Sequence, residues 1–266
     1  MPGQAPLAVS LGDPAGIGPE LIAAAWLRRE AERLPPFFVA GGGRVLEDAA
    51  RSLGLDVPVI PIGDTGDAGE AFAEGLPVLG EPGPSWRPGE PDDESARLAF
   101  DSLKWAAALV RDGQAIGLVT APVAKAGLAK IGFDQPGQTE FLASACGIAS
   151  ENAVMMLAGP SLRAVPLTIH VPLAEVPGLL TTELITGKAR IVARALQRDF
   201  GIASPRLALA ALNPHAGEDG RFGDEEARII APAVAQLADE GIAATGPHPA
   251  DALFAAHERE RYDAAL

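Results

Sequence analysis

The sequence of 266 residues has a single cysteine, Cys146, and this scarcity excludes two kinds of structure. One thiol can form neither an intramolecular disulfide nor a cysteine-rich metal site. We interpret Cys146 as a small buried hydrophobic residue within a helix. Stability must therefore come from an ordinary hydrophobic core, for which a chain of this length is ample.

Positive side chains are also scarce: 21 Lys and Arg stand against 35 Asp and Glu, which gives a formal net charge of −14. Nucleic acids and anionic membranes are bound by basic surfaces. We therefore expect neither as a partner. A local pocket can still bind a small anion despite the negative net charge of the protein, so an anionic substrate is not excluded.

Long hydrophobic runs are missing as well. None reaches the roughly 18 apolar residues of a membrane-spanning helix. The first positive side chain is Arg28, so the amino terminus lacks the basic segment of a secretory signal. From these features we expect a cytoplasmic protein.

Several catalytic signatures are absent too, among them H-E-x-x-H, G-x-S-x-G and the Walker A loop. Residues 12–20 contain Gly16-x-Gly18, but Leu21 stands where the dinucleotide fingerprint G-x-G-x-x-G requires a third glycine. This segment is interpreted as a tight turn between a strand and a helix. The alternative places Asp13 and the loop backbone at the mouth of a cleft.

What the chain does have is an alternation of apolar runs with helical patterns. The clearest helix is 93–112, with acidic residues at its amino end. Prolines confine the run 57–62 to a sheet edge, and residues 63–91 are expected to be irregular. The alternation predicts an α/β fold with a mostly parallel sheet. We place strands at residues 7–11, 37–40, 57–62, 115–120, 154–157, 164–169 and 206–212, and helices at 19–34, 44–53, 93–112, 139–146, 187–200 and 224–240.

A connection containing Gly and Pro at residues 132–137 separates two α/β halves. We accordingly predict two domains, 1–134 and 135–266.

Two histidines stand out because each follows an apolar run and lies beside a proline. His215 comes after the run 207–212 and Asn213-Pro214, and His170 ends the run 164–169 shortly before Pro172. Ligands of open α/β sheets bind beyond the carboxyl ends of strands. Two imidazoles in such places can share one metal or substrate, or they can be ordinary residues at strand ends.

Other polar residues occupy similar positions. Lys125 follows a strand and can offer its ammonium group to a phosphate or carboxylate, or simply face solvent. Gln138 and Thr139 open a helix, whose amino terminus can bind an anion, although Thr139 as an N-cap explains them equally well. Asp251 can supplement a histidine metal site. We expect His248 to lie in a turn and His257 on the surface.

Taken together, these segments resemble the 4-hydroxythreonine-4-phosphate dehydrogenase family, usually called PdxA. The resemblance implies an α/β/α two-domain fold similar to isocitrate and isopropylmalate dehydrogenases, rather than a Rossmann domain. It also implies a homodimer with active sites at the subunit interface. The matching stretches span the chain in family order: GDPAGIGPE at 12–20, TAPVAK at 120–125, GQTEFLA at 137–143, VMMLAG at 154–159, the run to His170, LNPHAGEDGRFGDEE at 212–226 and GPHPADALF at 246–254.

The activity that the resemblance implies is oxidation of 4-phosphooxy-L-threonine by NAD or NADP. The product decarboxylates to 3-amino-2-oxopropyl phosphate, on the route to pyridoxal 5′-phosphate. A divalent metal would lower the pKa of the substrate hydroxyl. Imidazole ligands favour zinc, with magnesium, manganese and cobalt as alternatives. No residue of the cofactor site is assigned.

Carried over by position, the resemblance implies that His170 and His215 are two of three histidine ligands to the metal. Gln138 and Thr139 would contact the substrate. Lys125 and Asp251 would lie near the site in catalytic roles.

Two departures from the family pattern affect these expectations. The family usually has histidine where this chain has Gln138, and glutamine can bind but cannot transfer a proton by titrating. The sequence also ends at Leu266, where the family continues into a Tyr-His-Asp-Gln-Gly segment with the third metal histidine. We therefore expect a chain that truly ends at Leu266 to bind metal weakly and to turn over little.

Three alternatives stay open at this point. A relative within the family would act on another phosphorylated hydroxy acid or on a dihydrodiol carboxylate. A phosphate acyltransferase on a related α/β scaffold would need neither metal nor nicotinamide, and would leave the paired histidines unexplained. A non-catalytic ligand-binding remnant would fit a chain without the carboxyl-terminal segment.

Overall fold

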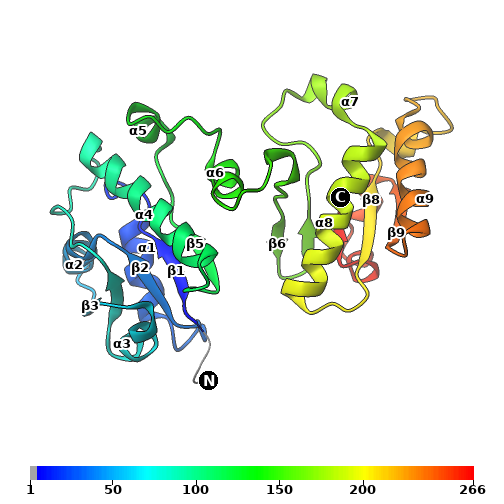
Figure 1. The fold of residues 1–266 in the computed structure, drawn as a ribbon. Coiled ribbons are helices and arrows are strands. Elements are labelled where there is room, and N and C mark those ends of the chain that lie inside the picture. The colour runs from blue at the N-terminus through cyan, green and yellow to red at the C-terminus, as the bar shows by residue number, and fades with distance from the viewer. Residues whose placement is uncertain (1–4) are drawn as a thin grey trace. The chain divides into compact units, whose positions relative to one another are not determined.

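The computed structural model describes residues 5–266, which fall into two compact units (Figure 1). Unit 1 is Met1–Gly147 and unit 2 is Ile148–Leu266. Each unit is built around its own five-stranded sheet, and the strands are mostly parallel. The expected α/β class is thereby confirmed. The domain division at residue 134 stays a prediction.

The sheet of unit 1 is parallel throughout, in the order β3-β4-β2-β1-β5. The run that contains Pro58 and Pro61 forms the edge strand β3, as its prolines predicted. The strands are β1 (Leu7–Ser10), β2 (Phe37–Ala40), β3 (Val59–Ile62), β4 (Leu76–Leu79) and β5 (Gly117–Thr120).

Helices cover both faces of this sheet. On one face Val9 and Leu11 pack against α1 (Gly18–Leu27) and α2 (Gly43–Ser52). On the other face Ala8 packs against α4 (Asp93–Arg111). Alternate residues of one strand therefore enter two separate cores, which gives unit 1 three layers.

The helix expected at 93–112 is confirmed, and its start is fixed by a capping box. The carboxylate of Asp92 accepts the Ser95 N–H at 2.8 Å, and the Ser95 hydroxyl accepts the Asp92 N–H at 3.0 Å. The hydrogen bond from the Ser95 backbone is the main reason that the pKa of Asp92 is lowered.

The expectation of irregular structure at 63–91 was wrong for part of that segment. It contains α3 (Ala68–Glu74) and β4, which lies inside the sheet between β3 and β2. Pro77 within β4 obscured the strand, because a proline normally indicates an edge position. Burial of all four residues of β4 outweighs the lost backbone donor.

Unit 2 has the strand order β6-β7-β10-β8-β9, with all pairs parallel except β6 with β7. The run 164–169 was expected to be a strand, but β7 ends at Ala164. Pro166 cannot donate to a ladder, and β10 pairs only with Ala164. The strands are β6 (Leu157–Gly159), β7 (Leu162–Ala164), β8 (Arg206–Ala210), β9 (Ala243–His248) and β10 (Ala264–Ala265).

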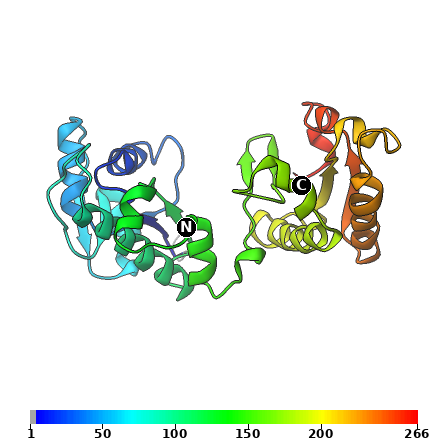
Figure 2. The same cartoon turned by 90° about the horizontal axis from the view of Figure 1, so that it is seen from above.

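The long helix α8 (Thr182–Phe200) runs along one face of this sheet, beside α9 (Ala231–Asp239) (Figure 2). It starts earlier than the expected residue 187, because the Thr181 hydroxyl caps it by accepting the Leu184 N–H. The expected helix at 224–240 is divided into a π-helical turn, Glu226–Ile230, and α9.

The shorter helices are α5 (Lys125–Lys130), α6 (Gln138–Ala145), α7 (Val176–Leu179) and α10 (Ala250–Leu253). Cys146 follows α6 and is exposed, so its interpretation as a buried residue was wrong. Among the residues that the structure describes, no helix is both long and apolar enough to span a membrane.

Candidate functional site

The carboxyl ends of four strands line one edge of the sheet in unit 2. Strands β7, β10, β8 and β9 are mutually parallel neighbours, so their ends point the same way. The chain reaches His170 shortly after β7, His215 shortly after β8 and Asp251 shortly after β9. The topology of one sheet thus assigns three of the predicted site residues to loops at one edge.

A pocket of about 250 Å³ opens at this edge. One wall is the segment 165–168, which leads from β7 to His170, and another is 210–212, which leads from β8 to the His215 loop. Leu180, just before α8, and Ile185, within α8, also line it. Ligands of α/β sheets occupy such crevices, so the pocket and the histidine loops belong to one candidate site.

Both histidines have a backbone conformation that L residues rarely adopt. The φ angle is +58° at His170 and +52° at His215, in the left-handed region. Both side chains are exposed. A strained residue persists only where its surroundings enforce it, and such residues concentrate at functional sites. The sequence pattern gave no sign of this strain.

The His215 loop is anchored by a buried carboxylate. The backbone N–H of Asn213 donates to Glu226 Oε1 at 2.7 Å, and its side-chain amide donates to Glu226 Oε2 at 3.0 Å. The same amide donates to Glu225 Oε2 at 2.7 Å. Sequence reasoning missed this network. Its only signal was the adjacent pair Glu225-Glu226 after a glycine-rich loop.

Asp251 lies in α10, and α10 contacts the 3₁₀ turn Pro214–Gly217 that contains His215. The exposed Asp251 carboxylate and the imidazole of His215 therefore belong to contacting elements of one chain. His248 was expected to lie in a turn, but it is the last residue of β9, where its Nε2 is 2.9 Å from the Thr245 hydroxyl. His257 is on the surface, as predicted.

The remaining predicted residues lie in unit 1, around the starts of α5 and α6. Lys125 is the first residue of α5, and its Nζ donates to the Pro136 carbonyl at 3.0 Å. Pro136 lies just before α6, whose first residues are Gln138 and Thr139. One hydrogen bond therefore connects the Lys125 segment to the segment of the two predicted substrate residues.

Thr139 was considered as the N-cap of α6, and this was wrong. The N-cap is Gly137, which has no side chain to offer. The first N–H groups of α6 therefore have no capping side chain, and both Gln138 and Thr139 are half-buried. Aromatic packing holds the short helix, since the Phe141 ring lies 5.5 Å from that of Phe100 in α4.

The turn after β1 is tied to the turn after β5. The Asp13 N–H donates to the Pro122 carbonyl at 2.8 Å, and the Asp13 carboxylate accepts the Ala15 N–H at 2.9 Å. Gly12 has φ of +72°, and a Cβ there would lie 2.6 Å from the same carbonyl oxygen. The contacts of Asp13 thus support the interpretation of residues 12–20 as a tight turn.

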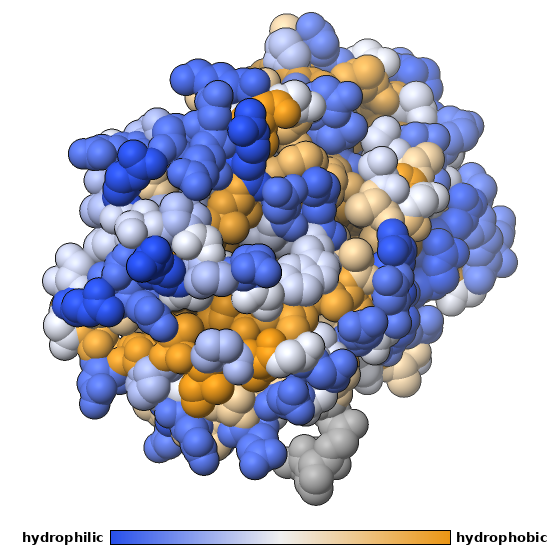
Figure 3. All heavy atoms as spheres, turned by 60° about the vertical axis from the view of Figure 1, so that its left-hand side comes forward, coloured by the Kyte–Doolittle hydropathy of each residue, from blue (hydrophilic) through white to orange (hydrophobic). Residues whose placement is uncertain are grey.

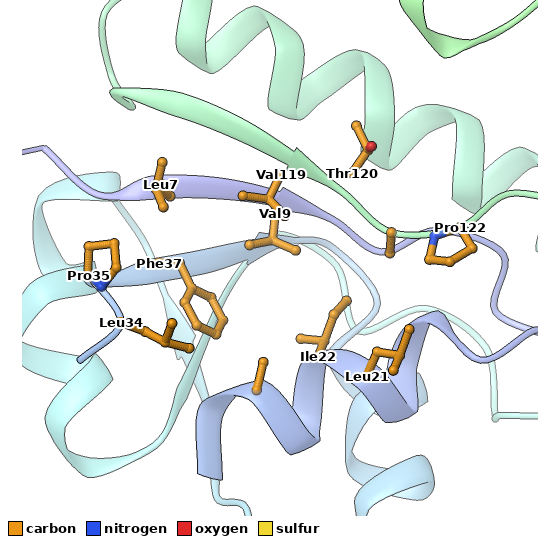
Figure 4. Close-up of a pocket in the computed structure, with 12 residues that line it drawn as sticks. Leu7, Val9, Leu21, Ile22, Leu34, Pro35, Phe37, Val119, Thr120 and Pro122 are labelled. Atoms are coloured by element: carbon orange, nitrogen blue, oxygen red, sulfur yellow. The ribbon is translucent and has the colours of Figure 1, made fainter. Parts of the chain in front are cut away.

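Unit 1 also contains an apolar groove of about 330 Å³ between α1 and strands β1, β2 and β5. The space-filling view shows an apolar patch on the face turned forward (Figure 3). In the close-up, Leu21 and Ile22 of α1 face Val9 of β1 across the groove (Figure 4). Its lining offers almost no polar group for a phosphorylated substrate, so we do not place the site there.

The donor set at the sheet edge of unit 2 is chemically suited to a divalent metal, because imidazoles are good zinc ligands. Within residues 5–266, no group of three or more His, Cys, Asp or Glu side chains is close enough to hold an ion. His170 and His215 thus stay a prediction as metal ligands.

Comparison with known proteins gives consistent results. The family model for "Pyridoxal phosphate biosynthetic protein PdxA" matches residues 33–266. A 4-hydroxythreonine-4-phosphate dehydrogenase of Erythrobacter litoralis is 60% identical over 99% of this chain and 78% of its own length. That of Zymomonas mobilis is 49% identical over 98% of this chain and 77% of its own length.

Solved structures agree. The 4-hydroxythreonine-4-phosphate dehydrogenase of Klebsiella pneumoniae superposes with a TM-score of 0.85 at 33% identity, over 98% of this chain and 80% of that one. A terephthalate 1,2-cis-dihydrodiol dehydrogenase of Burkholderia xenovorans gives 0.67 at 26% identity, over 99% and 78%. With the model match and the high identities, these similarities establish that the chain belongs to the PdxA family.

Proposed function

We propose that the protein is a 4-hydroxythreonine-4-phosphate dehydrogenase of pyridoxal phosphate biosynthesis. It oxidises 4-phosphooxy-L-threonine with NAD or NADP, and the product loses CO₂. The observation that supports this most directly is the 60% identity to the Erythrobacter litoralis enzyme across 99% of the chain. The assembly as a homodimer with the site at the subunit interface, and the cytoplasmic location, are proposals that rest on the family.

The first proposed role is metal binding by two histidines. His170 and His215 would hold the divalent metal, zinc before magnesium, manganese or cobalt, which acts when bound as a Lewis acid toward the substrate hydroxyl. When bound, a nicotinamide cofactor would supply the hydride acceptor. Both imidazoles are exposed.

Substrate binding is proposed for the start of α6. Gln138 and Thr139 stand at a helix amino terminus whose N-cap, Gly137, has no side chain. Free N–H groups and the helix dipole favour an anionic group there. Gln138 donates and accepts hydrogen bonds but does not titrate, so it binds the substrate and takes no part in proton transfer.

Lys125 and Asp251 are proposed to act as charged residues of the site. Lys125 supplies a positive charge beside the start of α6, where its hydrogen bond to Pro136 holds it. Asp251 supplies a carboxylate near the His215 turn, from where it can orient an imidazole or hold a proton.

The test is reduction of NAD and of NADP by 4-phosphooxy-L-threonine, with zinc or cobalt added, followed by nicotinamide absorbance. His215→Ala should lower kcat by more than about 100-fold, because loss of even an outer partner of a metal ligand costs about 10- to 100-fold. His257→Ala is the matched control, since His257 is 78% exposed, and it should leave kcat unchanged. Equal activity of the two variants would show that His215 is not in the site.

A dihydrodiol carboxylate is a second candidate substrate. The similarity to a terephthalate dihydrodiol dehydrogenase supports this second candidate, and Gln138 departs from the usual family histidine. The same assay with a cis-dihydrodiol carboxylate decides between the two. Faster turnover of that compound than of 4-phosphooxy-L-threonine would replace the first proposal.

A further inference from the structure

The loop after β8 has an unusual backbone. Every residue from His215 to Gly220 has a positive φ, and four of these six residues are not glycine. A left-handed conformation costs roughly 1–2 kcal/mol for each L residue. The loop therefore needs strong contacts elsewhere to hold this shape.

One buried side chain holds the residue at the start of this loop. Glu226 is only 5% exposed, and both its carboxylate oxygens accept hydrogen bonds from Asn213. Burial by itself raises the pKa of Glu226, but hydrogen bonds from the Asn213 side chain and from backbone N–H groups outweigh it. The net pKa lies below the ordinary value. The carboxylate is therefore charged and fully engaged at neutral pH.

The glycines of the loop are placed so that the chain can wrap around this carboxylate. A Cβ at Gly217 would lie 2.8 Å from Glu226 Oε2. A Cβ at Gly223 would lie 2.4 Å from Asn213 Nδ2 and 2.5 Å from Glu225 Oε2. Both approaches are closer than real Cβ atoms allow, so the backbone at these points is fitted to the Asn213–Glu226 pair.

The anchor lies two residues from His215 in the chain. Only Pro214 separates Asn213 from His215, and its ring fixes its own φ. A constraint on both the backbone and the side chain of Asn213 thus limits the backbone path to His215. Glu226 accepts its hydrogen bonds from Asn213, so its action on His215 is indirect.

We propose that Glu226 is a positioning residue: it holds Asn213 by two hydrogen bonds and thereby fixes the strained His215 loop in its binding conformation. The proposal rests on the proposed function, which gives His215 its role. Glutamine in place of Glu226 can accept only one of the two Asn213 donors well, because its amide nitrogen would face the other.

The first measurement needs no metal and no substrate. Hydrogen exchange of the metal-free Glu226→Gln chain should be about 10- to 100-fold faster at residues 213–223, since a buried charged hydrogen bond is lost. The matched control is Asp263→Asn, which also turns a carboxylate into an amide. Asp263 Oδ2 accepts the Arg206 N–H at 2.8 Å, at the opposite end of β8. That variant should leave the His215 loop unchanged.

The second measurement is Co²⁺ affinity by titration, with thermal melting of each variant alongside. Glu226→Gln should weaken Co²⁺ binding about 10- to 100-fold, the usual cost of losing an outer partner of a metal ligand. Asp263→Asn should not weaken it, even if it lowers the melting temperature equally. If Glu226→Gln does not fold, Asn213→Ala takes its place: it keeps the backbone bond and should show a smaller change in the same direction.

The outcomes separate the two proposals. Exchange and Co²⁺ affinity in Glu226→Gln that equal those of Asp263→Asn would overturn the positioning role and leave the proposed function standing. Co²⁺ affinity that His215→Ala does not change would overturn the metal site, whereas faster exchange in the loop would still support the anchor. A third outcome is also decisive. If His215→Ala weakens Co²⁺ binding, but Glu226→Gln speeds hydrogen exchange in the loop without changing Co²⁺ affinity, the positioning role is overturned.

Discussion

The turn after β1 in unit 1 and the turn after β8 in unit 2 solve the same geometric problem in different ways. Each reverses the chain at the carboxyl end of a central strand. The first uses glycine at the left-handed position, Gly12, and a backbone hydrogen bond to Pro122. The second puts His215 and Ala216 in left-handed conformations and holds them with a buried carboxylate.

The difference extends across the two units. Among the described residues, unit 1 has one non-glycine residue at positive φ, Arg33, whereas unit 2 has five. Where only a backbone shape is needed, glycine supplies it without strain. Where the loop must also present an imidazole, glycine is excluded and the strain has to be borne by other contacts. The five are His170, His215, Ala216, Glu218 and Asp219.

The largest expected effect is on the turn of unit 1. Gly12→Ala should destabilise the protein by about 2–5 kcal/mol, because the strain of a left-handed alanine adds to overpacking. The new Cβ would meet the Pro122 backbone oxygen at 2.6 Å, and backbone cannot swing aside as a flexible side chain can. Urea unfolding followed by tryptophan fluorescence measures this, since Trp26, Trp86 and Trp105 all lie in unit 1.

Gly113→Ala is the matched control for this prediction. Gly113 lies in the same unit with φ of +74°, but nothing is within 4 Å of its added Cβ. Gly113→Ala should lower the free energy of unfolding by only about 1 kcal/mol. The strain of a left-handed alanine is partly offset because alanine makes the unfolded chain less flexible than glycine does. Equal losses for the two variants would mean that the Gly12 turn relaxes, and that its backbone is no more fixed than an open loop.

The second prediction concerns acid. The pKa of Asp92 in unit 1 is lowered, and so are the pKa values of four carboxyl groups of unit 2, Glu226, Asp263, Asp199 and Glu240. A lowered pKa in the folded state adds stability above the unfolded value of about 4. That stability is lost as the pH falls through the folded pKa, so below about pH 4 unit 2 should weaken first.

Two probes distinguish the units in this experiment. Tryptophan fluorescence reports unit 1 alone, while far-UV circular dichroism also includes α8 and α9 of unit 2. The dichroism should begin to fall at a higher pH than the fluorescence changes. Coincident acid transitions would indicate that the two units unfold as one cooperative body.

The sequence predicted the elements that depend on local chemistry. The acidic start of α4 and the prolines of β3 were sufficient to place both correctly. It failed for elements whose formation depends on contacts with residues that are distant in the sequence. Strand β4 was missed because only burial between two other strands explains Pro77, and β10 is too short to leave a pattern.

The candidate site likewise has features that local sequence predicts and features that depend on distant residues. The placement of His215 after a strand was predictable from its apolar run, whereas the run 164–169 before His170 was wrongly expected to be a strand, since β7 ends at Ala164. The bond between Asn213 and Glu226 was not predictable, because its partners are separated by a loop whose path no local pattern fixes. Nor does any propensity predict that two histidines adopt left-handed backbone.

The smallest expected effect is also the most direct test of the contrast between the two turns. Ala216 has φ of +54° and follows His215, so Ala216→Gly removes left-handed strain without touching the imidazole. Glycine also makes the unfolded chain more flexible, which offsets part of the gain. The net result should be a stabilisation of about 0.5–1 kcal/mol, measured as hydrogen-exchange protection or the urea midpoint of unit 2. Ala235→Gly, on the exposed side of α9, should instead destabilise the same unit by about 1 kcal/mol. Opposite signs for one chemical change would locate the strain in the His215 loop. Destabilisation by both would mean that the loop is not strained at Ala216, and that the two units differ less than their backbone angles indicate.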